Sequence, residues 1–324
     1  MAVKPLFIFL FCGNKKHISF FILFRIYNTV CLFRINTRTR QMKLLSFIRP
    51  DGSKSYGLFQ GDGVIDLGLR LSFKFRNIKE LLKAEALTLA EKFIGEPVDY
   101  QVDEIKFLPV VETPNKILCV GMNYQAKRQE FDEHNDAPTL FVRFPDSQTG
   151  HDCYLLKPDI SNEFDYEGEL AVIIGKAGKH ITRENALDYI AGYSCYMDGS
   201  VRDWQHSWFT AGKNWPETGA FGPWLVTCDE IANPNELDIR TYLNAQLVQD
   251  DNTGNMVRSV VELIEYISTF AILSPGDVII TGSPGGVGKK RTPPLFLKEG
   301  DIVEVEIEKI GRLRNQIISE SKLL

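Results

Sequence analysis

The 324-residue chain is 44% apolar and 24% charged, a composition that favours a folded protein of one or two domains and disfavours disorder. Its net charge of −5 is unevenly distributed, because residues 1–41 hold seven Lys/Arg and no acidic residue and leave 30 Lys/Arg against 42 Asp/Glu in the rest. An acidic body argues against a nucleic-acid partner, since affinity for a phosphate backbone comes mainly from clustered Lys/Arg.

The first 41 residues differ in character from the rest of the chain. Their apolar runs, Pro5–Cys12 and Ile18–Phe24, are shorter than the roughly 20 residues of a membrane helix, so we expect no membrane association. We interpret residues 1–41 as a non-core extension. Either translation really starts at Met42, or the Arg-rich segment is a targeting peptide. The six cysteines lack CxxC spacing and fit buried thiols in a reducing compartment, so a cytoplasmic location is predicted.

Residues 42–112 are predicted to form a small β-rich N-terminal domain. Lys43–Ile48 and Tyr56–Phe59 have the composition of two strands joined by a turn at residues 50–52. Residues 78–94 have apolar positions at helical spacing. Thr113-Pro114 indicates a linker to the next domain.

Residues 113–320 are predicted to form the catalytic domain. Short apolar or β-branched runs bounded by Gly, Pro or Asp outnumber the two predicted helices, Arg183–Tyr189 and Val257–Phe270. Because strands and helices do not alternate, a doubly wound parallel sheet is disfavoured. The expected class is therefore α+β and strand-rich.

A pair of acidic residues precedes the buried run Leu170–Ile174. In a strand, residues i and i+2 point to the same face, so Glu167 and Glu169 aim two carboxylates at one volume. Two carboxylates at ~4 Å repel by about 1 kcal/mol in water and by more when buried. The pair is therefore a solvated strand end, a pair with one protonated member, or a site for a cation. An all-oxygen ligand set favours Mg²⁺, Mn²⁺ or Ca²⁺.

Two further polar residues stand in positions that suit a site. Asp198 ends an apolar strand and is followed by Gly199, which suits a carboxylate delivered at a strand terminus. Lys213 lies between aromatic residues. It is either a surface lysine with a buried stem or a cation that binds an anionic substrate.

Eight segments, in this order, resemble the fumarylacetoacetate hydrolase family, in particular members that isomerise 2-hydroxyhepta-2,4-diene-1,7-dioate or 5-carboxymethyl-2-hydroxymuconate. Together they span about 200 residues. The segments are Gly121–Tyr124, Phe164–Gly175, Ala191–Tyr193, Asp198–Gln205, Gly212–Asn214, Gly222–Trp224, Pro275–Gly288 and Gly300–Val305.

The resemblance implies a fold, an assembly and a metal site. The fold would be a mixed β-sheet roll with flanking helices, and the protein would be a homodimer. Glu167, Glu169 and Asp198 match the family's metal ligands. The ion would be Mg²⁺ or Mn²⁺, with Ca²⁺ as an alternative, and it would act as a Lewis acid that stabilises an enolate.

The resemblance also implies residues that act on a small anionic substrate. Glu130, Lys127 and Lys213 would be catalytic. The expected substrate contacts are Tyr124, Arg143, Gln205, Thr281 and Ser283.

Lys127 departs from the family pattern. Many lyase members have His three residues before the Glu that corresponds to Glu130, and that pair activates a water molecule. A lysine is normally protonated at neutral pH and is a poor general base unless it is strongly desolvated. His134 could replace the missing imidazole or could be an exposed histidine of a lid.

The leading hypothesis is a metal-dependent isomerase or decarboxylase of 2-oxo or 2-hydroxy-dienoate dicarboxylic acids, as in the catabolism of aromatic compounds. Hydrolysis of a C–C bond is the less favoured hypothesis, because it needs a base that activates water and Lys127 is a poor base. Enolisation needs proton transfer but no attacking hydroxide. Two alternatives remain. One is a hydrolase of acylpyruvate or fumarylacetoacetate type, and the other is a metal- and metabolite-binding member with weak catalysis.

Overall fold

The computed structural model describes residues 19–26, 29–36 and 42–322, and the chain divides into two compact units, Met1–Arg40 and Gln41–Leu324. In the first unit, the described residues form an antiparallel hairpin of β1 (Ser19–Ile26) and β2 (Thr29–Asn36). The predicted apolar run at residues 5–12 lies outside the described residues.

A chain that begins at Met42 is expected to keep the stability and activity of the full chain. The Met42 amide donates to Thr227 Oγ1 at 3.2 Å, and the Thr227 amide donates to the Met42 carbonyl at 3.1 Å. Met42, the first described residue of the second unit, is therefore held by hydrogen bonds within that unit. Melting temperature should change by less than about 2 °C, with turnover unchanged. A larger loss of either would show that residues 1–41 stabilise the body.

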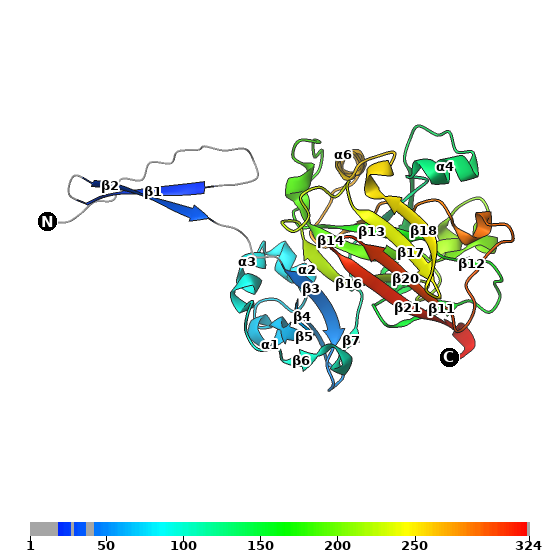
Figure 1. The fold of residues 1–324 in the computed structure, drawn as a ribbon, viewed down its shortest axis with the longest axis horizontal. Coiled ribbons are helices and arrows are strands. Elements are labelled where there is room, and N and C mark those ends of the chain that lie inside the picture. Colours follow the sequence, from blue (N-terminus) through cyan, green and yellow to red (C-terminus); the bar gives the residue numbers. More distant parts are fainter. Residues whose placement is uncertain (1–18, 27–28, 37–41, 323–324) are drawn as a thin grey trace. The chain divides into compact units, whose positions relative to one another are not determined.

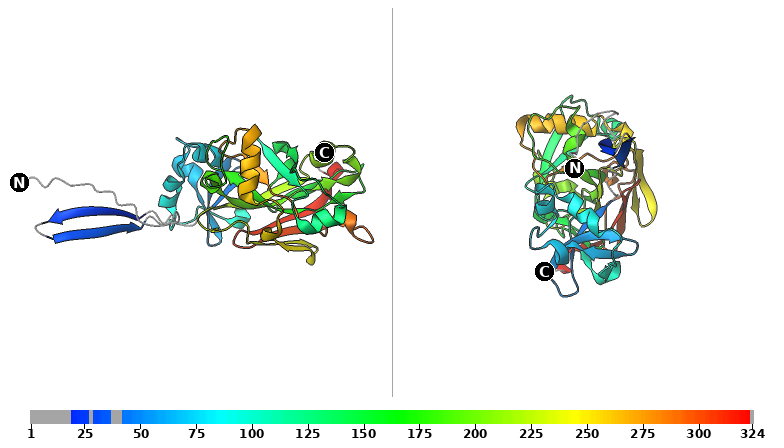
Figure 2. Two further views of the ribbon diagram at one scale, coloured as in Figure 1. Left: turned by 90° about the horizontal axis from the view of Figure 1, so that it is seen from above. Right: turned by 90° about the vertical axis from the view of Figure 1, so that its left-hand side faces the viewer.

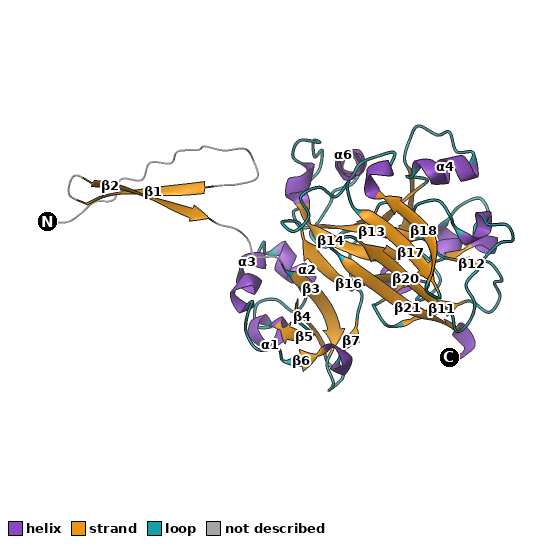
Figure 3. Cartoon of the chain, in the orientation of Figure 1, coloured by secondary structure: helices purple, strands orange, loops and turns teal. Residues whose placement is uncertain are grey.

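Among the described residues, the largest sheet has twelve strands (Figures 1 and 3). Its main path runs β6-β5-β4-β3-β16-β14-β13-β19-β8-β9, with β7 beside β3 and β10 beside β16. Pairing is mostly antiparallel, but β19 with β8 and β10 with β16 are parallel, so the sheet is mixed. The strands are β3 (Lys43–Ile48), β4 (Lys54–Gln60), β5 (Gly63–Asp66), β6 (Tyr100–Gln101), β7 (Lys106–Phe107), β8 (Ile117–Gly121), β9 (Thr139–Arg143), β10 (Gln148–Thr149), β13 (Gly168–Ile174), β14 (Ile190–Met197), β16 (Gly219–Thr227) and β19 (Val278–Ile280).

A second sheet packs face to face on the central strands of the first, and the two layers can be followed in Figures 1 and 2. Its order is β11-β21-β20-β17-β18. Alternation of buried and partly buried residues along β17 and β20 matches a sheet with one face in the core. The strands are β11 (Tyr154–Lys157), β17 (Asp238–Leu243), β18 (Gln246–Asn252), β20 (Ile302–Ile307) and β21 (Gly311–Ser319). A short pair, β12 (Phe164–Asp165) with β15 (Ser200–Val201), lies beside the site.

The helices of the second unit are short. The α-helices are α1 (Leu67–Leu71), α2 (Ile78–Lys83), α3 (Leu87–Ala90), α4 (Gln125–Phe131), α5 (Thr210–Lys213) and α6 (Val260–Phe270). The 3₁₀ turns are η1 (Glu91–Phe93), η2 (Val102–Glu104), η3 (Pro145–Ser147), η4 (Ala186–Tyr189), η5 (Arg202–Trp204), η6 (Thr253–Asn255), η7 (Gly288–Lys290) and η8 (Glu320–Lys322). None of the helices in the described ranges combines the length and hydrophobicity that crossing a bilayer requires.

The strand-rich mixed-sheet prediction is confirmed, whereas two helix predictions need correction. The predicted helix at 78–94 is interrupted between α2 and α3, because Glu85 has a φ of 51° and the Ala86 amide donates to the Leu81 carbonyl. The predicted helix at 183–189 is only the turn η4, since the chain enters β14 at Ile190. The predicted helix at 257–270 forms as α6, capped by Ser259 with Glu262 in a capping box.

Residues 42–112 share a core with the rest of the unit. Strand β3 pairs with β16, and Leu44, Ile65 and Leu81 belong to the same buried cluster as Phe221 and Val278. Residues on both sides of position 112 thus contribute to one buried cluster, and the division into two domains there stays a prediction.

His151 lies at the contact between these two parts. Its ring packs edge-on against Phe107, with centroids 4.8 Å apart, and its Nδ1 accepts from the Arg314 amide at 3.1 Å. Burial lowers the pKa of His151, and Arg314 lowers it further, although Asp152 acts in the opposite direction.

The His151→Gln variant is expected to reduce the loss of stability at mildly acidic pH. In the unfolded chain, histidine takes up a proton near pH 6.5, whereas folded His151, whose pKa is lowered, takes one up only at lower pH. The contribution of His151 to the free energy of unfolding is therefore complete above pH 6.5 and is lost as the pH falls below 6.5. Glutamine can still accept a hydrogen bond but cannot become charged. The drop in unfolding free energy from pH 8 to pH 5.5, measured with urea, should therefore be smaller in the variant than in wild type. His134→Gln changes an exposed histidine and is the control. An equal effect in both variants would contradict the assignment.

Candidate active site

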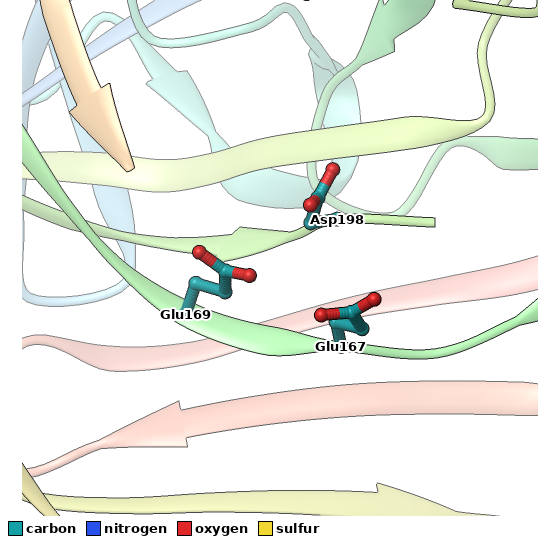
Figure 4. Close-up of side chains that lie close together, drawn as sticks. All are labelled: Glu167, Glu169 and Asp198. Atoms are coloured by element: carbon teal, nitrogen blue, oxygen red, sulfur yellow. The ribbon is translucent and has the colours of Figure 1, made fainter. Parts of the chain in front are cut away.

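Three carboxylates meet where β13 begins and β14 ends. The two strands are antiparallel, with Gly168 opposite Met197, so Glu167 and Asp198 become neighbours, and the Asp198 amide donates to the Glu167 carbonyl at 2.8 Å. One ligand oxygen each from Glu167, Glu169 and Asp198 lies within 4.8 Å of the others (Figure 4). The pairing of β13 with β14 thus adds Asp198 to the two glutamates that strand periodicity places on one face.

Gly168 between the two glutamates is required by the second sheet. A Cβ at this position would lie 2.1 Å from Thr241 Oγ1 and 3.1 Å from a methyl carbon of Val305. The close approach of β17 and β20 therefore leaves room only for glycine between the two glutamates.

The carboxylates are buried, at 4%, 2% and 0% exposure for Glu167, Glu169 and Asp198. Burial raises the pKa of Glu169 well above its usual value, and the charges of Asp198 and Glu167 raise it further. For Glu167, burial acts in the same direction, but nearby Lys and Arg side chains outweigh it and hold the pKa well below its usual value. Glu169 therefore experiences the repulsion within the cluster, whereas the negative charge of Glu167 is compensated by nearby cations.

Buried cations surround Glu167. Its Oε1 lies 2.7 Å from Arg202 Nη2 and 3.2 Å from Lys213 Nζ, and its Oε2 pairs with Lys127 Nζ. Ser283 Oγ also donates to Oε2 at 2.7 Å. Both oxygens of this carboxylate are thus engaged.

Asp198 is held by two cations as well. Arg143 Nη1 lies 2.7 Å from its Oδ1, and Lys213 Nζ pairs with its Oδ2. Burial alone would lower the pKa of Lys213, but Asp198 and Glu167 raise it above its ordinary value, so this lysine is an ammonium. Lys213 consequently bridges two of the three carboxylates.

The residues present fit a hard divalent cation. The donors are all carboxylate oxygens, which Mg²⁺ and Mn²⁺ prefer and which Ca²⁺ also accepts. Glu169 accepts from the Gly282 amide at 2.6 Å, and burial with the charges of Asp198 and Glu167 outweighs the effect of Lys127 and Lys213 on its pKa, so a cation between the carboxylates would relieve the repulsion. The cluster could therefore hold a metal ion.

Arg143, Thr281 and Ser283 are buried and hydrogen-bonded within the protein. The guanidinium of Arg143 bonds to Asp198, to the Gly199 carbonyl and to Thr218. Thr281 Oγ1 donates to the Leu170 carbonyl at 3.1 Å. These contacts hold the carboxylates and the turn that follows β19 in place, and the predicted substrate contacts of these three residues stay predictions.

Tyr124 and Gln205 leave donors unused. The buried Tyr124 hydroxyl and Gln205 Nε2 make no hydrogen bond within the described part of the protein. Burial raises the pKa of Tyr124 well above its usual value, and the charges of Asp251 and Glu169 raise it further. Gln205 Oε1 accepts from Arg202 Nη1 at 3.4 Å, and Arg202 pairs with Glu167. A buried donor without a partner is costly, which favours a role in binding a ligand.

Glu130 and His134 are exposed, whereas the three carboxylates are buried. Glu130 is exposed and accepts from the Gly286 amide at 2.7 Å, which fastens α4 to the glycine-rich turn. His134 is exposed and contacts Asp132. Lys127, which projects from the same helix, is the residue of this segment that reaches Glu167.

Two buried residues were absent from the sequence-based site. Asp165 accepts from Arg202 Nε at 2.8 Å, from the Gly288 amide at 2.8 Å and from the Lys289 amide at 3.1 Å. Arg202 in turn pairs with Glu167, so the glycine-rich turn is linked to the carboxylate cluster. Their places beside Glu167 and Asp198 in the sequence motifs were an available signal.

The fold and the cluster define a strand-rich protein whose buried acidic site could hold a divalent metal. Residues 116–318 match the family described as "Fumarylacetoacetate (FAA) hydrolase C-terminal", and the chain belongs to this family, whose members are enzymes.

Three relatives illustrate the range of the family. The human "Oxaloacetate tautomerase FAHD2A, mitochondrial" is 42% identical over 86% of this chain and 93% of its own length. The structure of a probable 2-hydroxyhepta-2,4-diene-1,7-dioate isomerase from Mycobacterium abscessus has a TM-score of 0.73 at 28% identity, covering 87% and 99% of the two chains. Maleylpyruvate hydrolase from Sphingobium sp. SYK-6, in complex with manganese(II) and pyruvate, has a TM-score of 0.74 at 26% identity, covering 86% and 99%.

Proposed function

We propose that this protein is a divalent-metal-dependent enzyme that catalyses proton transfer next to the carbonyl group of a small 2-oxo dicarboxylic acid. The reaction would be keto–enol tautomerisation, as named for the oxaloacetate tautomerases it is similar to, or the related isomerisation of a dienoate. The observation that carries this proposal is the buried cluster of Glu167, Glu169 and Asp198 with Lys213 bridging two of its members.

The charges around the cluster suit a substrate with two carboxylates. Four carboxylates lie together with four cations, and their charges balance when all are ionised. Adding a divalent cation leaves two positive charges in a buried site, which a dianionic substrate would neutralise. The eight residues are Asp165, Glu167, Glu169, Asp198, Lys127, Arg143, Arg202 and Lys213.

Each group would have a distinct part in the reaction. The metal, when bound, would supply a Lewis acid that makes the proton at C3 of a 2-oxo acid more acidic. The Lys213 ammonium would stabilise the negative charge that develops on the substrate oxygen. In the enol-to-keto direction it would donate the proton that C3 gains, and the resulting amine would take up the proton that the enol hydroxyl loses. Gln205 and Tyr124 would donate to substrate oxygens through the groups that are otherwise unpartnered. Burial of these groups would keep competing water away.

Hydrolysis of a C–C bond is the second candidate, since one relative is a maleylpyruvate hydrolase. The contacts of Lys127 support tautomerisation instead, because its amine is engaged by Glu167 and Ser283 and does not resemble an imidazole available to activate water. Decarboxylation of the same acids needs the same charge stabilisation. A weakly catalytic metabolite-binding protein would retain the ligands without turnover.

The Lys127→His variant is expected to gain hydrolysis of acylpyruvate substrates. It would place an imidazole, with a pKa near 6.5, one turn of α4 before Glu130. Product formation from an acylpyruvate should rise above the wild-type rate, with tautomerase activity equal or lower. Efficient hydrolysis by wild type, untouched by the substitution, would mean that another group handles the water.

A direct assay separates these candidates. Enol-to-keto conversion of oxaloacetate, followed by absorbance with Mn²⁺, with Mg²⁺ and with a chelator, should be accelerated only when the metal is present. Cleavage of maleylpyruvate, isomerisation of the dienoate and release of CO₂ are measured in parallel. Faster cleavage than tautomerisation would replace the proposal by hydrolysis, and binding without any turnover would favour the metabolite-binding alternative.

We also propose a location, an assembly and a metabolic role for the protein. A cytoplasmic homodimer that acts in the catabolism of aromatic compounds would follow from the sequence, whereas the vertebrate tautomerases it is similar to are named as mitochondrial. Light scattering on the purified protein tests the dimer. Fractionation of cells that express the full chain tests the location.

A further inference from the structure

Lys127 is bound to an oxygen that a metal would need. Its ammonium contacts Glu167 Oε2 and Ser283 Oγ, and its side chain is 4% exposed. The other Glu167 oxygen is engaged by Arg202, Lys213 and Ser200. Neither oxygen is left for a further cation unless one of these contacts is exchanged.

We infer that Lys127 acts as a tethered cation that competes with the divalent metal for Glu167 and thereby weakens metal binding. This inference rests on the proposed metal site but concerns binding alone, so it can fail while that site and its activity stand. It also gives the residue that departs from the family pattern a role other than that of a base.

Helix α4 keeps Lys127 in this place. Lys127 lies in the first turn of the helix, and Glu130, one turn later, binds the Gly286 amide at 2.7 Å. Ser283 and Gly286 belong to the same glycine-rich turn, so the helix is fastened to that turn at two points. The ammonium is consequently held at the carboxylate and not free in solvent, which makes its local concentration high.

Lys127 is the Glu167 partner best suited to exchange. Arg202 is also paired with Asp165, and Lys213 is also paired with Asp198, so displacing either would break a second buried ion pair. The second contact of Lys127 is the neutral hydroxyl of Ser283. Exchange at Oε2 therefore disrupts one ion pair, whereas exchange at Oε1 disrupts two.

The test is Mn²⁺ binding measured by calorimetry without substrate. Lys127→Gln and Lys127→Met remove the cation, and the dissociation constant should fall by about tenfold or more, because a unit charge at a ligand oxygen interacts strongly with a dication in a buried site. Lys127→Arg keeps the charge and should stay within about threefold of wild type. Arg128→Gln removes one charge from the adjacent residue of the same helix, whose guanidinium bonds to the Asn135 carbonyl, and should leave the affinity unchanged.

The rise in melting temperature with added Mn²⁺ gives a second readout and reports on the folding of each variant. It should occur at lower Mn²⁺ concentration in Lys127→Gln than in wild type. Unchanged or weaker binding in Lys127→Gln, or equal tightening in Arg128→Gln, overturns the competition. Absence of Mn²⁺ binding in wild type and all variants overturns both the competition and the proposed metal dependence. Normal Mn²⁺ binding without tautomerase activity overturns only the proposed reaction.

Discussion

Glu169→Gln is expected to abolish Mn²⁺ binding and turnover while the folded state becomes no less stable. Glu169 faces the charges of Asp198 and Glu167, and these, together with burial, raise its pKa well above the usual value. An amide removes that repulsion and can still accept from the Gly282 amide. Calorimetry should detect no Mn²⁺ binding, and the melting temperature without added metal should be equal to or above that of wild type.

Asp198→Asn is expected to lose metal binding together with stability. Arg143 is fully buried, and its ion pair with Asp198 would be broken, as would that of Lys213. Removing one partner of a buried pair leaves a charge uncompensated and costs about 3–5 kcal/mol. In urea without metal, the unfolding free energy should therefore fall in Asp198→Asn and should not fall in Glu169→Gln. Unchanged Mn²⁺ affinity in both would show that these residues are not the ligands.

The second large effect is expected for Lys213→Met, with a loss of turnover of about 10²–10³-fold. The substitution removes the ammonium that bridges Asp198 and Glu167 and lies 5.1 Å from the centre of the Phe141 ring. Mn²⁺ affinity should be retained or tightened, because a competing positive charge is lost. Loss of kcat with metal binding intact would assign Lys213 to the reaction and not to the architecture.

Two further variants serve as controls for Lys213→Met. Lys213→Arg keeps the charge in a larger, planar group and should recover part of the rate. Lys289→Met changes a half-exposed lysine beside Glu163 and should leave kcat unchanged. If Lys213→Met retained wild-type turnover of oxaloacetate, the charge that develops on the substrate would have to be stabilised elsewhere.

Much of the cluster could be predicted from sequence because strand periodicity is a local property. The side chains of residues i and i+2 lie on one face of a strand whatever surrounds it, so the sequence alone places Glu167 and Glu169 on the same face. Helix α6 is similar, since Ser259 and Glu262 cap it within one turn. Glu85 shows the limit, because its backbone has a φ of 51° that its residue type does not favour.

The sequence by itself determined a strand-rich fold, the same-face glutamates and, through eight ordered motifs, the family. Only the tertiary structure decided which charges meet. The pairing of β13 with β14 brings Asp198 to Glu167, and α4 and α5 bring Lys127 and Lys213 to the same carboxylate from distant parts of the chain. The physical reason is that ion pairing depends on distance and burial in three dimensions, whereas strand and helix patterns depend on neighbours along the chain.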